Sequence, residues 1–153
     1  MEQILGLDLG EVRIGVAISD PLCLFASAFG LIEENNDEDR LNRIADIVNE
    51  HEIFEIVVGY PLHLDGRKSE RCHYTQEMME KMRDRFPDIK VVPWDERLST
   101  IEAGKKLRES KPNMSHKERK QLIDAMSAQV ILQRYLSYRA NIGRDDNLMD
   151  FDF

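Results

Sequence analysis

The chain has 153 residues, 42% of them hydrophobic and 33% charged, and a formal net charge of -8. Such a composition excludes a disordered or fibrous protein, and the length suits one domain with a sizeable core. An acidic chain is also a poor general binder of nucleic acid, so any such binding has to come from a local basic surface.

The sequence contains no run of 18 apolar residues and no basic segment followed by an apolar leader. We therefore expect no membrane span, no membrane partner and a cytoplasmic location. Cys23 and Cys72 are not in a C-x-x-C arrangement, and the four histidines are scattered along the chain. We expect two free thiols and no zinc site.

Three apolar segments open the chain, and they predict strands over residues 3–9, 13–19 and 25–32. The connections between them are short enough for antiparallel hairpins, so we expect a meander. Asp8 stands at the end of the first strand, where a charge is costly to bury without a partner. A structural alternative is that Asp8 only caps the turn at Gly10.

Helices and strands alternate in the remainder of the chain, and two βα crossovers place strands four and five beside strand one. We predict an α/β fold with an RNase H-like element order, β-β-β-α-β-α-β-α-α, in which a five-stranded mixed sheet carries helices on both faces. Residues 1–140 are expected to form a single domain, and residues 141–153 an acidic, flexible tail. The later predicted elements are a helix beginning at 35–37, a strand over 55–60, a helix around 74–86, a strand over 89–94, and helices over 99–109 and 115–139.

Carboxylates occur at three positions near the predicted carboxyl ends of the strands, where ligands gather in α/β sheets. Asp8 ends strand one, Asp95 and Glu96 follow strand five, and Asp124 lies in an apolar helix that we expect to be largely buried. The acids after strand five could instead be surface charges or pair with the arginine that follows them. A buried Asp124 needs a metal ion or a basic partner, and Lys120 lies one turn earlier.

Carboxylates that converge in this way suit Mg²⁺ or Mn²⁺, because both ions prefer oxygen ligands. Two such ions about 3.5–4 Å apart could hold the attacking and leaving oxygens of a phosphoryl displacement. We therefore predict a site for two ions. Gly10 and Gly15, on either side of the first turn, are interpreted as space that lets a phosphate backbone approach.

Residues 104–120 are strongly basic, since they contain seven lysines and arginines against Glu109 and Glu118. Such a patch can hold a nucleic-acid backbone by phosphate contacts that read no sequence. An ordinary solvated helix face is the structural alternative. The residues that we expect to contact substrate are Arg13, Arg67, Lys68, Arg97, Lys105, Lys106, Lys117 and Lys120.

Four blocks of the sequence resemble the YqgF family of the RNase H-like superfamily. They are residues 6–17 (GLDLGEVRIGVA), 58–66 (VGYPLHLDG), 94–103 (WDERLSTIEA) and, more weakly, 120–132 (KQLIDAMSAQVIL). The blocks fall in the order of the family, and the third is the most specific. The turn of the first block is less specific, since sugar kinases and actin-like ATPases share it.

The resemblance implies an RNase H-like fold and a metal-dependent nuclease that processes the precursor of 16S ribosomal RNA during ribosome biogenesis. It implies that Asp8, Glu96 and Asp124 are both the catalytic residues and the ligands of Mg²⁺ or Mn²⁺. Structured RNA is the expected partner, and branched DNA is the alternative, with the protein acting as a Holliday junction resolvase. RuvC-type resolvases carry another acid one turn after the last aspartate, where this chain has Ser127.

Two further interpretations stay open at this point. The chain could be a nucleic-acid-binding module without catalysis, although the intact set of acids argues against that. An ATP-dependent phosphotransferase would need two such domains around the nucleotide, and the length of this chain suits one. The chain could be a monomer or a homodimer, and we expect Met78, Met79 and Met82 to pack in the core rather than face a partner.

Overall fold

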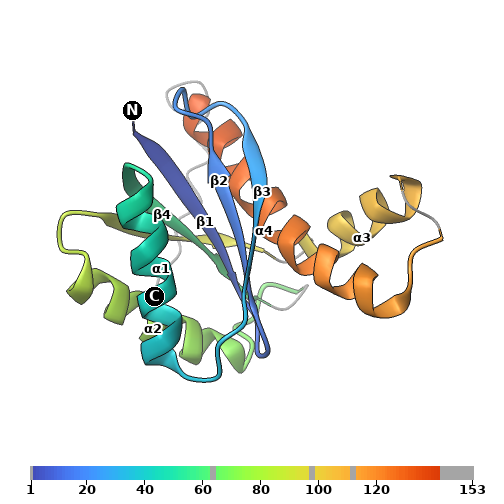
Figure 1. Cartoon of the computed structure of the whole chain (residues 1–153), viewed down its shortest axis with the longest axis horizontal. Coiled ribbons are helices and arrows are strands. Elements are labelled where there is room, and N and C mark those ends of the chain that lie inside the picture. The colour runs from blue at the N-terminus through green and yellow to red at the C-terminus, as the bar shows by residue number, and fades with distance from the viewer. Residues whose placement is uncertain (1, 63–64, 97–98, 111–112, 142–153) are drawn as a thin grey trace.

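The computed structural model describes residues 2–62, 65–96, 99–110 and 113–141. Its strands form one five-stranded sheet in the order β3-β2-β1-β4-β5, with the helices packed around it (Figure 1). The elements, in chain order, are β1 Gln3–Leu9, β2 Ile14–Ser19, β3 Ala26–Ile32, α1 Asp37–Glu50, β4 Ile53–Tyr60, α2 Arg71–Arg85, β5 Lys90–Asp95, α3 Ser99–Ser110 and α4 His116–Ala140.

The sheet is mixed, as predicted. β1 pairs antiparallel with β2, and β2 pairs antiparallel with β3, which gives the expected meander. β4 pairs parallel with β1 on its other side, and β5 pairs parallel with β4. The carboxyl ends of β1, β4 and β5 therefore meet at one edge of the sheet, and this edge is where ligands bind in α/β proteins.

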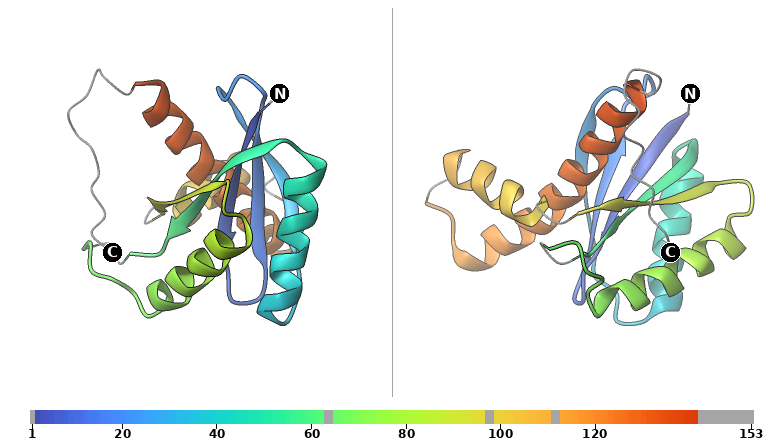
Figure 2. Two further views of the ribbon diagram at one scale, coloured as in Figure 1. Left: turned by 90° about the vertical axis from the view of Figure 1, so that its left-hand side faces the viewer. Right: turned by 180° about the vertical axis from the view of Figure 1, so that it is seen from behind.

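Helices cover both faces of the sheet, which confirms the predicted layers (Figure 2). On one face, α1 and α2 pack against alternate apolar residues of the strands, and Met78, Met79 and Met82 are buried in this core as expected. On the other face, α4 packs through Ala128, Ile131 and Leu132. Alternation along each strand divides the two cores, because successive side chains point to opposite faces.

The first half of α4 and the whole of α3 project beyond the sheet as a helical hairpin, which we call the α3–α4 arm (residues 99–110 and 116–124; Figures 1 and 2). Ala103 and Leu107 of α3 are 0% and 2% exposed, and Gly104 faces Ile123 of α4. Apolar packing between the two helices thus holds the arm together, while its outer surface stays open to solvent.

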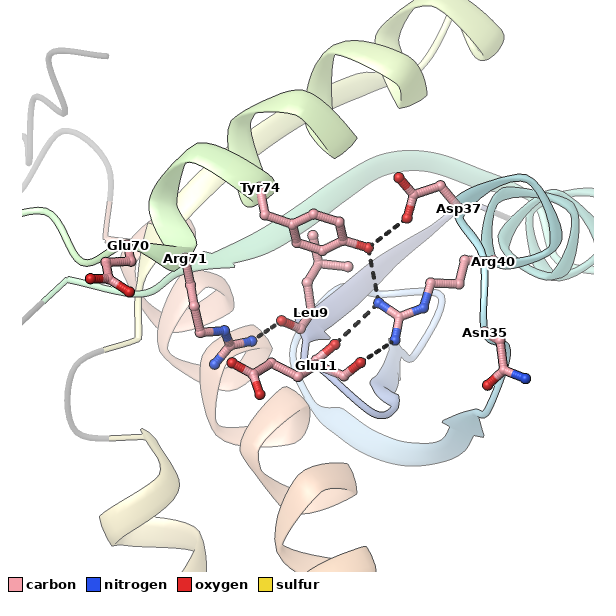
Figure 3. Close-up of a pocket in the computed structure, with 9 residues that line it drawn as sticks. Leu9, Glu11, Asn35, Asp37, Arg40, Glu70, Arg71 and Tyr74 are labelled. Atoms are coloured by element: carbon pink, nitrogen blue, oxygen red, sulfur yellow. Dashed lines mark hydrogen bonds between the residues drawn. The ribbon is translucent and has the colours of Figure 1, made fainter.

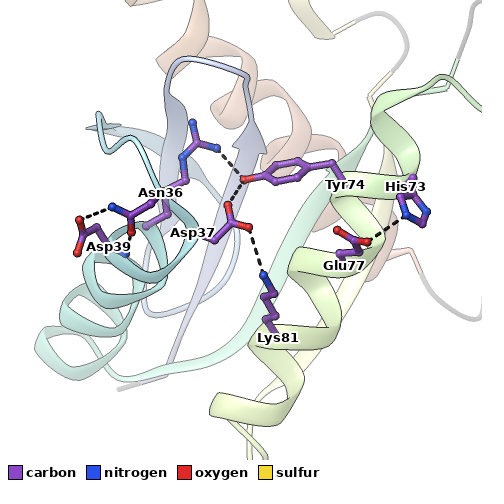
Figure 4. A network of polar contacts seen from close by, with 8 residues as sticks. Asn36, Asp37, Asp39, His73, Tyr74, Glu77 and Lys81 are labelled. Carbon is purple, nitrogen blue, oxygen red and sulfur yellow. Dashed lines mark hydrogen bonds and ion pairs between the residues drawn. The ribbon is translucent and has the colours of Figure 1, made fainter.

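A polar network joins the start of α1 to α2 (Figure 4). The Tyr74 hydroxyl donates to Asp37 at 2.9 Å, and Lys81 reaches the other Asp37 oxygen at 3.2 Å. Burial alone would raise the pKa of Asp37, but these two hydrogen bonds outweigh it and lower the pKa. Asp37 therefore stays ionised and fixes the distance between the two helices on this face.

Side chains cap the start of two helices. The Asn36 side chain accepts a hydrogen bond from Asp39 N–H, and Ser115 Oγ accepts one from Glu118 N–H, so both helices begin at side-chain caps. Asn141 is the C-cap of α4, and the rest of the predicted acidic tail, 142–153, lies outside the described residues. Among the residues described, both cysteines are free thiols, and none of the helices is long and apolar enough to cross a membrane.

Candidate active site

Asp8 lies near the carboxyl end of β1, on the face of the sheet that α4 covers. The neighbouring residues Leu7 and Leu9 point into the opposite core, so alternation turns Asp8 toward α4. Its partner on β2 is Gly15, over which the backbone of α4 passes at Asp124. The β-sheet thus presents Asp8 at the edge where ligands are expected.

Glu96 directly follows β5, two strands away from Asp8. Its N–H donates to the carbonyl of Tyr60 at 3.3 Å, which ties it to the end of β4. Its carboxylate lies over Gly59, since a Cβ at that position would be 2.7 Å from Glu96 Oε2. Gly59 therefore makes room for Glu96. The sequence shows a glycine near the end of a buried strand, but it does not show this role.

Asp8 and Glu96 meet at this edge and share a hydrogen bond between their carboxyl groups. Burial raises the pKa of each, and the charge and hydrogen bond of Asp8 raise that of Glu96 further, to well above its ordinary value. Two carboxyl groups in contact repel each other when both are ionised, so ionising the second one is unfavourable. The pair therefore requires either a shared proton or a cation.

Asp124 approaches the same edge from α4, and its charge contributes to the raised pKa of Asp8, after burial. Its basic partner is Arg13 of the β1–β2 turn, whose Nη1 donates to Asp124 Oδ2 at 2.9 Å. Lys120, the candidate from spacing, is exposed. In the described part of the chain, no three carboxylate, imidazole or thiol side chains lie close enough to hold one ion, because Asp124 faces Arg13.

The glycines of the first turn differ from their predicted role. A Cβ on Gly15 would lie 2.1 Å from the backbone carbonyl oxygen of Asp124, and one on Gly10 would lie 2.4 Å from that of Arg13. The space at both positions is filled by the protein's own backbone rather than left for a phosphate, so that interpretation is wrong. Gly15 instead lets α4 approach β2 closely enough to bring Asp124 to the site.

The predicted substrate-contacting residues fall into separate groups. Arg13 is 15% exposed and engaged with Asp124 and, at 3.5 Å, with Glu33. Arg67 and Lys68 are exposed on the loop after β4, where Arg67 pairs with Asp65. Arg97 lies outside the described residues. The remaining members are exposed on the α3–α4 arm, namely Lys105, Lys106, Lys117 and Lys120.

Arg71, the first residue of α2, is a cation at the acid pair that the sequence did not single out. Its Nη2 donates to the carbonyl of Leu9, next to Asp8, and its positive charge opposes the burial that raises the pKa of Asp8 and of Glu96. It ends a charged segment that also contains Arg67, Lys68 and Glu70, and nothing in the sequence separates it from these neighbours. Only the fold brings it to the acids.

Comparison with known proteins shows the family of this chain. The RuvX family model, described as Holliday junction resolvase, matches residues 2–138. Proteins named "Putative pre-16S rRNA nuclease" are similar over most of the chain: that of Ruminiclostridium cellulolyticum is 38% identical over 88% of this chain and 93% of its own length. That of Halothermothrix orenii is 40% identical over 90% and 96%.

Solved structures show the same fold at low sequence identity. The fowlpox virus resolvase in complex with Holliday junction DNA superposes with a TM-score of 0.57 at 11% identity, covering 90% of this chain and 98% of that one. RuvC of T. thermophilus with a Holliday junction substrate gives 0.53 at 11% identity, covering 92% and 96%. The RNase H-like fold is therefore confirmed, and the family match over residues 2–138 shows that this chain belongs to the RuvX family of resolvase-type nucleases.

Proposed function

We propose that this protein is a metal-dependent nuclease that hydrolyses phosphodiester bonds in the precursor of 16S ribosomal RNA, in the cytoplasm. The observation that carries the proposal is the contact between the half-buried carboxyl groups of Asp8 and Glu96 at the carboxyl ends of parallel strands. The substrate is taken from the relatives, which are named for pre-16S rRNA.

The chemistry of the donor set fits Mg²⁺ or Mn²⁺. Asp8 and Glu96 offer carboxylate oxygens that desolvation and mutual repulsion leave in need of positive charge. Asp124 would be the third ligand, and it is held nearby by Arg13 until a cation competes for it. Two bound ions would activate the attacking water and stabilise the leaving 3′ oxygen.

The residues of the chain itself then position the substrate. The α3–α4 arm extends from the edge that carries the acids, with Lys105, Lys106, Lys117 and Lys120 exposed on it. Lysines in such a place contact phosphates without reading bases, so they would hold structured RNA beside Asp124. Arg67 and Lys68 would serve the same purpose from the loop after β4.

Removing the charge of the arm should weaken RNA binding in a salt-dependent way. In the variant with Lys105, Lys106 and Lys117 changed to alanine, we expect the slope of log affinity against log salt to fall by about 2–3, roughly 0.7–0.9 for each lost phosphate contact. Binding titrations at several salt concentrations measure this slope. The matched control is Lys90→Ala, an exposed lysine on β5, and an unchanged slope in the triple variant would remove the arm from the proposal.

Gly59→Ala should reduce cleavage far more than it reduces stability. The added Cβ would meet two side-chain ends and no backbone atom, Glu96 Oε2 at 2.7 Å and Ile131 Cδ1 at 2.6 Å, so the contact can be relieved by moving side chains alone. A catalytic carboxylate displaced by a fraction of an ångström costs rate, and we expect a loss of about 10–100-fold. Cleavage rates and melting temperatures are compared with Gly30→Ala, whose Cβ meets nothing within 4 Å. Full activity in Gly59→Ala would argue against Glu96 as a ligand.

A Holliday junction is the second candidate substrate, and the description of the matching family favours it. Ser127, which stands where the resemblance expects another acid in RuvC-type resolvases, is 1% exposed and donates its hydroxyl proton to the Ile123 carbonyl at 2.8 Å. It is therefore occupied within its own helix. Cleavage assays with pre-16S RNA and with a four-way DNA junction, in Mg²⁺ and Mn²⁺, decide between the substrates. Cleavage of the junction alone would overturn the RNA assignment. Binding of either substrate without cleavage would indicate a non-catalytic module.

A further inference from the structure

An open cavity of about 460 Å³ lies between the first turns of α1 and α2 (Figure 3), on the face of the sheet opposite to α4. Leu9, Gly10 and Glu11, the residues that follow Asp8, form one wall of it. Arg71 also lines this cavity, and its charge acts on both Asp8 and Glu96, so this side chain connects the cavity with the acid pair. The cavity is open to solvent.

Two arginines, Arg40 and Arg71, line this cavity, and they differ in how many hydrogen bonds they make. Arg40 is 5% exposed, and its guanidinium donates to the carbonyls of Gly10 and Glu11 at 3.1 and 3.0 Å and to the Tyr74 hydroxyl at 2.9 Å. Arg40 is thus occupied in holding the β1–β2 turn. Within the described residues, Arg71 has one hydrogen bond, to the carbonyl of Leu9, and a guanidinium carries five N–H donors.

The position of Arg71 in its helix is unfavourable unless an anion lies in front of it. The first turn of a helix carries partial positive charge, so a cation there is opposed by the helix dipole. In the metal-free protein, Asp8 and Glu96 provide the compensating negative charge. Once divalent cations bind these carboxylates, Arg71 needs another anion, and the substrate phosphate is the anion that arrives at this edge.

We infer that Arg71 binds the phosphate that is cleaved, through hydrogen bonds from its guanidinium to a non-bridging phosphate oxygen. This inference rests on the proposed nuclease function and adds a catalytic residue to it. In the reaction, the water oxygen forms a bond to phosphorus while the bond from phosphorus to the 3′ oxygen breaks. The attacking water gives up a proton to solvent, and the 3′ oxygen leaves with the electron pair and takes up a proton from solvent. Arg71 stays protonated and stabilises the charge that grows on the phosphoryl oxygens.

The matched variants are Arg71→Ala and Arg71→Lys, with Arg85→Ala as the control. Arg85 lies in the last turn of the same helix, is exposed, and contacts the Asn42 side chain far from the acids. We expect single-turnover cleavage of pre-16S RNA to fall by about 100-fold or more in Arg71→Ala. Lysine should restore only a small part of the rate, because it lacks the planar fork of donors. Arg85→Ala should cleave like the wild type.

A binding measurement separates this inference from the nuclease proposal. With Ca²⁺ in place of Mg²⁺, the salt slope of RNA binding should fall by about 0.7–0.9 in Arg71→Ala and stay unchanged in Arg85→Ala. If Arg71→Ala has this smaller salt slope but the wild type cuts no RNA, the phosphate contact of Arg71 is supported and the nuclease proposal fails. If the wild type cuts RNA, and Arg71→Ala cuts it within about threefold of that rate or keeps the full salt slope, the role of Arg71 is overturned. A loss of rate that only follows a loss of Mn²⁺ affinity or of folding would also overturn it.

Discussion

Replacing Asp8 by asparagine should abolish cleavage and at the same time stabilise the metal-free protein. The same is expected for Glu96→Gln, because either change removes one of two half-buried carboxylates that repel each other. Activity should fall by more than about 100-fold, since even the outer partners of metal ligands are worth 10–100-fold. The melting temperature should rise by about 2–4 °C for each kcal/mol of relieved repulsion in a chain of this size.

The stability gain depends on pH with a definite sign. The folded protein holds the pKa of Glu96 well above the ordinary value of 4.5, and that of Asp8 above 3.8. Between the ordinary and the raised values, the folded state binds more protons than the unfolded state, so stability falls as pH rises through this window. Thermal unfolding of the metal-free wild type from pH 4 upward should show this fall, and the two variants should show less of it.

Asp20→Asn is the control, because the pKa of Asp20 is lowered, whereas those of Asp8 and Glu96 are raised. Asp20 also lies at the other end of the sheet. It accepts hydrogen bonds from the backbone N–H groups of Phe25, Leu24 and Leu22, which lower its pKa. The change should lower the melting temperature and leave cleavage intact. Mg²⁺ should raise the melting temperature of the wild type and of Asp20→Asn, but not of Asp8→Asn. An active Asp8→Asn protein would remove Asp8 from the catalytic set.

Gly15→Ala should destabilise the protein more than other single-methyl additions to the sheet. The new Cβ would lie 2.1 Å from the carbonyl oxygen and 2.9 Å from the carbonyl carbon of Asp124, and both atoms belong to the backbone of α4. Since the backbone of a helix cannot turn away as a side chain does, α4 has to move off the sheet. Overpacking commonly costs about 1–3 kcal/mol, and we expect the upper end or more, with a fall in melting temperature of about 6 °C or more.

The displacement of α4 also carries Asp124 away from Asp8, so cleavage should be lost even at temperatures where the variant is folded. Gly30→Ala is the matched control on the adjacent strand, with open space around the added methyl group. It should be neutral or slightly stabilising, since alanine costs less backbone entropy than glycine. Equal melting temperatures for the two variants would contradict the close seating of α4 on β2.

Much of the fold could be predicted from local patterns. Alternation and short connections identified the β1–β2–β3 meander. The two βα crossovers predicted strands on the free side of β1, where β4 pairs with β1 and β5 pairs with β4. The position of Asp8 at the end of a buried strand, and of Glu96 after another, followed from the strand ends alone. Because parallel strands share one carboxyl edge, the contact between these two acids was implied by the topology.

Details of the site that depend on tertiary distances could not be predicted. Spacing along α4 suggested Lys120 as the partner of Asp124, whereas the fold brings Arg13 from 111 positions away in the chain. Arg71 and Gly59 were missed for the same reason, since one arginine of a charged segment and one glycine near the end of a strand carry no pattern of their own. Gly15 was interpreted in terms of a ligand when its neighbour is a helix backbone.

Anomalous diffraction from a crystal of the full chain soaked in Mn²⁺ measures directly whether the three acids hold metal together. We predict Mn²⁺ bound by Asp8 and Glu96, with Asp124 released from Arg13 and turned to the ions. Soaked crystals of Asp8→Asn should lack that signal. Wild-type crystals in which the Asp124–Arg13 ion pair persists and no Mn²⁺ lies at Asp8 and Glu96, at concentrations that support cleavage, would contradict a divided metal site built from these residues.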